Sequence, residues 1–345
     1  MWWWMFLFCR KSRVVLIIGM IVKHLCLSCE SLAYRSFSYQ SRTSQYHRST
    51  FLFMSTTTTT TTNMIVEIHP LSSEPELIQL SNNNNNNVVG MKKVHFVRHA
   101  EGTHNVEKNY HCLSNFDARL TKVGEKQCIQ LAQSLSSSMM MESVDLVVTS
   151  PLTRCIQTSL FCFSSLLPKN IPFVVHESIR ETVNYHCDRR RSIQQLLHEF
   201  PTIDFSTTEE EEDGIWKEYE ERFASLKDPN TRQEYSNAHR ESAELYKVAH
   251  RGRLFFQWLS TRTERNIIVS THSAFLRCIL HWGHNDTGVP LAPSQHLDIR
   301  SDEEKKQTDT IPVVKFVGTN EFETFMRSDY ANCEMRSFLL LMKHT

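Results

Sequence analysis

The fold is decided by the stretch K-V-H-F-V-R-H-A-E-G-T-H-N, which spans residues 93–105. Its first part, Lys93–Val97, is short, largely apolar and rich in β-branched residues, and this composition predicts a buried strand that ends at Arg98. Polar side chains follow the strand at once. The stretch therefore predicts a loop of functional side chains at the end of a buried strand.

Strands and helices alternate along the chain beyond this stretch. Further strands are predicted at residues 144–148, 173–175, 266–270, 313–316 and 338–341. Apolar residues at helical spacing lie between them, and Thr121, Ser150 and Thr271 are the expected N-caps of three helices. This alternation predicts an α/β fold, a three-layer α/β/α sandwich with a mostly parallel central sheet.

Polar segments stand at the predicted strand ends and helix starts. They are residues 98–105, 150–154, 179–181 and 270–273. Because ligands bind beyond the carboxyl ends of the strands in open parallel sheets, we expect these segments to converge on one crevice. They supply histidines, arginines, an amide and a glutamic acid.

Such a set of side chains suits the transfer of a phosphoryl group to an imidazole. A neutral ring nitrogen must face phosphorus, and cations with N–H donors must meet the charge on the equatorial oxygens. Arginine can give two parallel N–H bonds to a phosphate. A carboxylic acid must stand near the leaving oxygen to protonate it.

The motifs resemble those of the histidine phosphatase superfamily in order and spacing, over residues 91–345. They are R-H-x-E-x-x-x-N at 98–105, L-T-x-x-G-x-x-Q at 120–127, S-P-L-x-R at 150–154, R-E at 180–181 and S-x-H at 270–272. The stretches E-T-V-N-Y-H-C-D-R-R-R-S at 181–192 and A-N-C-E-M-R-S at 331–337 are similar to the plant and fungal phosphoglycerate mutase-like proteins. The resemblance implies the phosphoglycerate mutase-like fold.

The resemblance also implies roles for individual residues. His99 is the expected nucleophile, and Glu181 is the expected proton donor, which acts as a base when water attacks phosphohistidine. The phosphate is expected to be held by N–H donors of Arg98, Asn105, Arg154, His272 and Ser273, the last through its backbone.

The chain departs from the superfamily pattern near the nucleophile. Ala100 and Ser273 stand where glycine is usual, and Gly102 stands where serine or threonine usually contacts phosphate, with Thr103 one place later. The polar cluster after the acid is either a solvated loop or a substrate-selecting lid whose arginines meet a second anionic group. The expected substrate-binding residues are Gly102, Thr103, His186, Arg189 and Arg190.

The reaction that the resemblance implies is hydrolysis of a phosphomonoester through phosphorylated His99. No metal ion or organic cofactor is expected, because arginine, histidine and backbone dipoles neutralise the phosphate. The alternatives are a phosphomutase of the phosphoglycerate mutase type and a non-catalytic scaffold that binds phosphorylated ligands. The expected partner is a small phosphorylated metabolite, and a phosphoprotein is the second option.

Composition narrows the partners further. Lys+Arg and Asp+Glu both number 38, so the chain lacks the cationic surplus of a nucleic-acid-binding protein. The C-x-x-C at Cys26–Cys29 has no second pair, so a zinc site is not expected. The acidic run Glu209–Asp213 is expected to be a solvated loop.

The N-terminal segment differs in character from the rest. Residues 1–50 combine a cationic segment, a short apolar stretch and a hydroxyl-rich stretch, which resembles an organellar or secretory targeting peptide. A membrane anchor that includes Met1–Phe8 is one alternative, and a later physiological start at Met64 or Met91 is another. Membrane contact is expected only through this segment, and the catalytic domain is otherwise expected in the cytoplasm.

Homopolymer tracts mark the boundary of the folded domain. Residues 51–90 include Thr56–Thr62 and Asn82–Asn87, which cannot bury a hydrophobic face, so this region is expected to be a low-complexity, disordered linker. The histidine phosphatase domain is expected to occupy residues 91–345.

Overall fold

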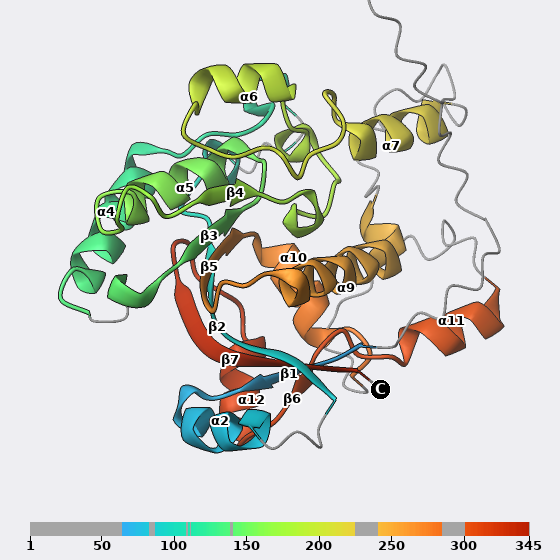
Figure 1. Ribbon diagram of the computed structural model, residues 1–345. Helices are drawn as coiled ribbons and strands as arrows, with labels where there is room; N and C mark the ends of the chain where they lie inside the picture. Colours follow the sequence, from blue (N-terminus) through green and yellow to red (C-terminus); the bar gives the residue numbers. More distant parts are fainter. Residues whose placement is uncertain are drawn as a thin grey trace, which may run out of the picture. The chain divides into compact units, whose positions relative to one another are not determined.

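The computed structural model describes residues 64–82, 87–107, 110, 112–138, 141–224, 241–284 and 301–344 (Figure 1). The predicted targeting peptide and the threonine tract lie outside these residues. In the part of the chain that the structure describes, no helix is long and apolar enough to cross a membrane.

A seven-stranded sheet forms the centre of the domain, with the strand order β4-β3-β5-β2-β7-β1-β6. The strands are β1 (Met64–His69), β2 (Val88–Arg98), β3 (Leu146–Thr149), β4 (Phe173–Val175), β5 (Asn266–Thr271), β6 (Lys315–Phe316) and β7 (Met335–His344). Among the described strands, β7 alone runs antiparallel to its neighbours. The predicted mostly parallel sheet is therefore confirmed.

Helices pack against both faces of this sheet. The helices are α2 (Glu74–Asn82), α3 (Thr103–Glu107), α4 (Lys122–Leu135), α5 (Thr153–Phe163), α6 (Ile193–Glu199), α7 (Gly214–Ala224), α9 (Leu245–Thr261), α10 (Ser273–His281), α11 (Asp302–Asp309) and α12 (Asn320–Arg327). Figure 1 shows α4 and α5 on one side of the sheet and α9 and α10 on the other.

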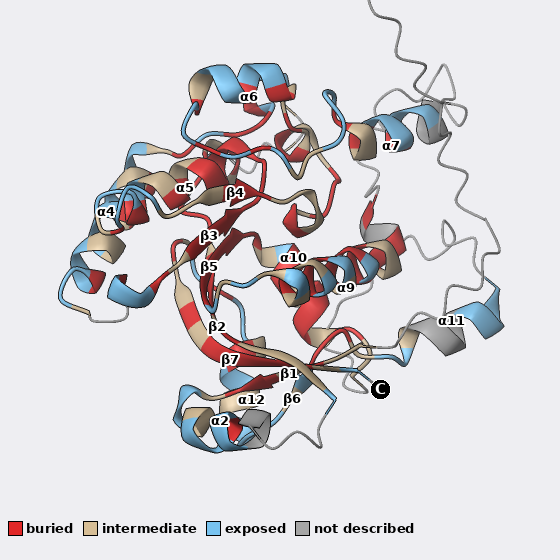
Figure 2. Cartoon of the chain, viewed as in Figure 1, coloured by how far each residue is buried: buried red, intermediate tan, exposed pale blue. Residues whose placement is uncertain are grey.

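Alternate residues of the strands point into two separate cores. Phe96 of β2 packs in a cluster with Phe255 of α9 and Phe275 of α10. The next residue, Val97, packs in a second cluster that includes Phe163 of α5. Successive side chains of a strand point to opposite faces, so the two cores lie on opposite faces of the sheet and the domain has the predicted three layers. Figure 2 shows β3 and β5 buried along their whole length.

The domain begins before the predicted start at Met91. Strand β1 pairs with β7 from Met64 to His69, and Ile68 has no exposed surface. Leu77 of α2 packs in a small cluster with Leu339 of β7. The prediction that residues 51–90 form a linker is therefore wrong for 64–82 and 87–90. The run M-I-V-E-I-H has an alternating pattern that suits a strand. It is short and lies between two homopolymer tracts, so the whole region was predicted to be low-complexity.

Two of the three predicted helix caps are wrong. In both cases a hydrogen bond to a residue distant in the sequence takes the place of the predicted cap. Thr121 caps α4 as predicted, because its side chain accepts a hydrogen bond from the Gly124 N–H. Helix α5 begins at Thr153 instead of Ser150, and its first N–H donates to the distant Asp117 carboxylate at 2.8 Å. The Thr271 hydroxyl donates to the Ile179 carbonyl at 2.7 Å and does not cap α10.

Candidate active site

Two buried histidines meet at the carboxyl ends of β2 and β5. These strands are parallel neighbours, and the backbone N–H of His99 donates to the Thr271 carbonyl at 2.9 Å. The rings of His99 and His272 lie 5.1 Å apart between centroids, and their exposed fractions are 1% and 0%. The predicted convergence of the first and last polar segments is therefore confirmed.

The His99 ring is oriented by the adjoining backbone and is held neutral. Its Nδ1 lies 2.8 Å from the Ala100 carbonyl oxygen, which can only accept a hydrogen bond, so we assign the proton to Nδ1. Burial, with the nearby Arg154, His104 and Arg98, holds the pKa of His99 well below 6.5. The Nε2 lone pair is therefore available at any ordinary pH.

Arg98 and Arg154 are each anchored through one part of the guanidinium group. The Nη1 of Arg98 donates to the Tyr330 carbonyl at 2.6 Å. Arg154 has no exposed surface, and its Nη1 and Nη2 donate to the Cys187 carbonyl at 2.6 Å and to Asp188 Oδ1 at 3.0 Å. The Nε of each arginine is buried and makes no hydrogen bond to any residue that the structure describes. A buried guanidinium N–H normally finds an acceptor, so both groups fit an anionic ligand.

The charge on Arg154 is secure despite its burial. Burial alone lowers the pKa of this guanidinium, but Asp188 and the other acidic groups around it together outweigh that effect, so the pKa is raised. The ion pair with Asp188 leaves further N–H groups of Arg154 unused. The same side chain can pair with Asp188 and donate to a phosphate oxygen.

His272 is fixed by a neighbour that the sequence did not mark for this role. Its Nε2 lies 2.8 Å from Ser150 Oγ and 3.3 Å from Cys155 Sγ. Burial, followed by the charge of Arg154, holds the pKa of His272 well below 6.5. Ser150 therefore orients the second histidine. Its place in a strand-end motif was the available signal, although the sequence favoured a helix-cap role.

Glu181 sits at the amino end of α10. Its carboxylate accepts hydrogen bonds from the backbone N–H groups of Thr182 at 2.9 Å and Phe275 at 3.1 Å. Burial raises the pKa of Glu181, and Asp188 raises it further. A raised pKa favours the protonated acid, which is the form that a proton donor needs.

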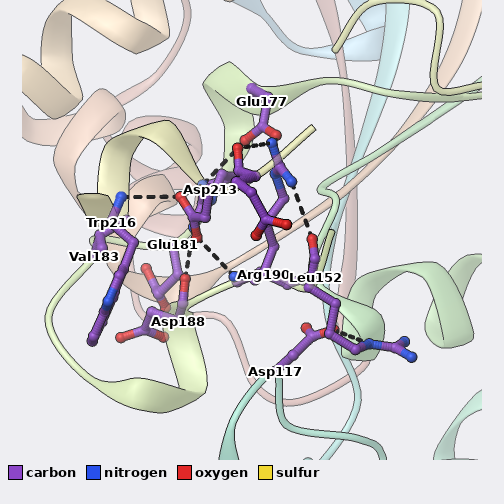
Figure 3. Close-up of polar contacts among 12 residues, drawn as sticks. Asp117, Leu152, Glu177, Glu181, Val183, Asp188, Arg190, Asp213 and Trp216 are labelled. Atoms are coloured by element: carbon purple, nitrogen blue, oxygen red, sulfur yellow. Dashed lines mark hydrogen bonds and ion pairs between the residues drawn. The ribbon is translucent and has the colours of Figure 1, made fainter. Parts of the chain in front are cut away.

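The neighbouring Arg180 does not pair with Glu181. It makes a two-point ion pair with Asp213, with both N–O distances at 2.7 Å, and both side chains are buried. Asp213 also accepts the backbone N–H groups of Arg190 and Trp216 (Figure 3). The interpretation of Glu209–Asp213 as a solvated loop is thus wrong for its last residue, because a buried arginine requires a counter-charge.

A hydrogen bond within the loop after β2 fixes the side-chain amide of Asn105. The side-chain oxygen of Asn105 accepts the Gly102 N–H at 3.0 Å. Gly102 forms an isolated β-bridge with Leu120, and Thr103 begins α3. The Ala100 N–H donates to the Thr158 hydroxyl at 3.0 Å, and Ala100 is fully buried.

Comparisons with known proteins agree with this geometry. A family model described as "Histidine phosphatase superfamily (branch 1)" matches residues 94–202. The chain is 31% identical over 281 residues to Phosphoglycerate mutase-like protein 1 of Arabidopsis thaliana, a match that covers 72% of this chain and 81% of that protein. The chain belongs to the histidine phosphatase superfamily. The resemblance seen in the motifs is confirmed.

Further relatives of the chain carry similar names. One is Phosphoglycerate mutase-like protein of Arabidopsis thaliana, 34% identical over 220 residues that cover 55% of this chain and 73% of that protein. Another is Probable phosphoglycerate mutase of Arthroderma benhamiae, 33% identical over 142 residues that cover 34% of this chain and 42% of that protein.

One of the two arginines predicted to bind substrate, Arg190, makes all its hydrogen bonds within the protein. Arg190 is 2% exposed, its Nε donates to Glu177, and its Nη groups donate to the carbonyls of Arg191 and of three residues in the acidic run. All its N–H groups are used, so the prediction that Arg190 binds substrate is wrong. Figure 3 shows its pairing with Glu177.

The other two residues of that cluster lie against aromatic rings. The Arg189 guanidinium stands 5.4 Å from the ring centre of Phe116 and 5.6 Å from that of Trp216. The ring of His186 lies 5.2 Å from the Trp216 ring. Both side chains are partly exposed, so their predicted role in substrate binding stays a prediction.

Within the described residues, one group of side chains lies close enough together to share a metal ion. Sulfur atoms of Cys128, Cys162 and Cys333 lie within 4.8 Å of one another, inside the apolar cluster that also contains Val97 and Ala100. The N–H of Cys333 donates to the carbonyls of Arg98 at 3.1 Å and His99 at 3.3 Å. Through Cys333, this group of cysteines therefore adjoins the backbone of Arg98 and His99.

Proposed function

We propose that this histidine phosphatase superfamily member hydrolyses phosphomonoesters through a phosphohistidine formed on His99. The observation that carries the proposal is a neutral His99 whose Nδ1 proton is held by the Ala100 carbonyl, beside two arginines with unpartnered buried Nε groups. A nucleophile surrounded by fixed cations and N–H donors is what transfer of a phosphoryl group requires.

In the first step, His99 Nε2 attacks phosphorus and the bond from phosphorus to the ester oxygen breaks. Arg98 and Arg154 donate to the equatorial oxygens, where negative charge accumulates. Protonated Glu181 gives its proton to the leaving oxygen, so an alcohol departs. The raised pKa of Glu181 supports this role.

In the second step, water attacks phosphorus and the bond from phosphorus to Nε2 breaks. Glu181, now a carboxylate, takes one proton from the water. The products are inorganic phosphate and free His99, and Glu181 is again protonated. Each proton and electron pair is therefore accounted for without a further reactant.

The burial of the site favours a small phosphorylated metabolite as substrate. His99 is 1% exposed and His272 is fully buried, so a phosphate on a folded protein surface would reach them with difficulty. The same burial bears on the mutase alternative, because a mutase must keep water from phosphohistidine.

The test uses the full-length protein, an aryl phosphate and a metal chelator. We expect phosphate release by the wild type, a loss of about 1,000-fold or more in His99→Asn, and no change in His198→Ala, an exposed histidine of α6. A phosphoryl label that is labile in acid and stable in alkali should appear on wild type only. Equal rates in folded wild type and His99→Asn would refute the proposal, and interconversion of phosphoglycerates without phosphate release would assign a mutase instead.

A further inference from the structure

A histidine ring occupies the space that a side chain at Gly102 would need. A Cβ atom built on Gly102 would lie 2.7 Å from His104 Cε1 and 2.8 Å from His104 Nδ1. Carbon atoms do not approach that closely in folded proteins. The described positive-φ glycines are Gly283 and Gly318, so the backbone at Gly102 does not itself exclude a side chain. The His104 ring is the main obstacle.

His104 points toward the nucleophile from α3. Its ring centre lies 5.6 Å from that of His99, and its exposed fraction is 5%. Among the described residues, its Nδ1 has no hydrogen-bond partner although it is buried, and the same holds for the Nε groups of Arg98 and Arg154. All three residues lie near enough to His99 to lower its pKa, and His104 is the one to which the sequence assigned no role.

The charge state of His104 follows from the same surroundings. Burial, with the positive charges of Arg154 and Arg98, lowers the pKa of His104 to about 2. The ring is therefore neutral at working pH and carries one N–H donor and one acceptor nitrogen. A neutral donor can bind an anion without adding a cation next to the two arginines.

We propose that His104 is a phosphate-binding residue whose ring N–H donates to the transferring phosphoryl group, in the space that a side chain at position 102 would otherwise fill. The proposal deepens the proposed function and rests on it. A plain packing role for His104 is the alternative. It is less suited to a polar ring beside His99 with one nitrogen buried and unpartnered, because an unpaired buried polar atom destabilises a site that only needs filling.

The proposal predicts that positions 102 and 104 depend on one another. His104→Phe keeps a ring but removes the donor, whereas His104→Gln keeps an N–H donor. Gly102→Ser should clash with His104 and weaken phosphate binding. In the double variant Gly102→Ser/His104→Ala the serine hydroxyl has room to replace the lost donor, so this variant should bind phosphate better than either single variant.

The experiment measures binding of inorganic phosphate by calorimetry and hydrolysis of an aryl phosphate, using full-length proteins and His198→Ala as control. We expect His104→Phe to lose about 100-fold in kcat, the usual effect of removing one donor to developing charge, and about tenfold in phosphate affinity. His104→Gln should recover at least half of the logarithmic loss. Melting temperatures identify any variant that fails to fold.

The outcomes separate the two proposals. If His104→Phe folds and matches wild type in both phosphate affinity and kcat, the role of His104 is refuted. The shared space is refuted if the double variant does not bind phosphate better than both Gly102→Ser and His104→Ala. Wild type that binds phosphate in a His104-dependent way but hydrolyses no ester would overturn the proposed function and leave the phosphate site standing.

Discussion

Replacement of Asp213 by alanine should destabilise the domain strongly. Asp213 is 4% exposed and accepts two hydrogen bonds from Arg180, at 2.7 Å each, and one from each of two backbone N–H groups. The substitution would leave a fully buried guanidinium without its main counter-charge. Breaking such a pair costs about 3–5 kcal/mol. Glu177 still lies 3.2 Å from Arg180 Nη1, so we expect the lower end, ~3 kcal/mol.

The effect should depend on pH in a defined direction. Burial raises the pKa of Asp213, but Arg180 and the backbone donors outweigh burial, so the pKa lies below its ordinary value. A carboxylate with a lowered pKa in the folded state stabilises the fold above its unfolded pKa, about 3.9, and this contribution disappears as the pH falls through the folded value. The difference between wild type and Asp213→Ala should therefore be full at pH 7 and shrink below about pH 4.

Urea unfolding followed by tryptophan fluorescence would measure this difference. Trp216 is a suitable reporter, because it is 1% exposed and its backbone N–H donates to Asp213. The matched control is Glu212→Ala, which changes an exposed member of the same acidic run and should stay within about 0.5 kcal/mol of wild type. A loss below 0.5 kcal/mol in Asp213→Ala, or an equal loss in the control, would show that the ion pair does not hold this region.

Three further predictions follow from the site and the fold. Arg154→Lys should lower kcat/KM by about 100-fold, because an ammonium cannot both pair with Asp188 and present the same N–H groups to phosphate. A variant with wild-type rates would refute the proposal that Arg154 binds the phosphate. The kcat of wild type should fall as the pH rises through the raised pKa of Glu181. The variant Glu181→Gln should lose this pH dependence and should hydrolyse alkyl phosphates about 100-fold more slowly. Deletion of residues 1–90 should yield an unstable protein, since it removes β1 with the fully buried Ile68, and a deletion variant that melts with wild type would contradict the sheet.

The architecture of the domain was largely predictable because its central strands are buried on both faces. All residues of β3 and β5 are buried, and such strands appear in a sequence as short, continuous apolar runs. The convergence of His99 with His272 followed from one rule, that parallel strands present their carboxyl ends at the same edge. The fold and the pair of histidines at the centre of the site could therefore be predicted from local composition.

The features that sequence analysis missed depend on partners far apart in the chain. Asp213 resembles its exposed acidic neighbours, and nothing in the run marks it as the counter-charge of Arg180. Ser150 was expected to cap a helix, but Asp117 binds the start of α5 and leaves the Ser150 hydroxyl for His272. A capping preference is a local tendency, whereas the partner that fills the cap is chosen by the tertiary fold.

Glu181 has a structural role and a proposed chemical one. It accepts hydrogen bonds at the start of α10, and it is the proposed proton donor. Its N–H partners, Thr182 and Phe275, bind a carboxylate more strongly than a neutral acid. Burial acts the other way and is the larger influence, so the pKa of this acid is raised. In the proposed reaction, the carboxylate left after the leaving oxygen takes the proton already has its donors in place at the positive end of a helix. The surroundings of Glu181 therefore favour the protonated acid more than water does, while they also supply donors to the anion that proton transfer would create.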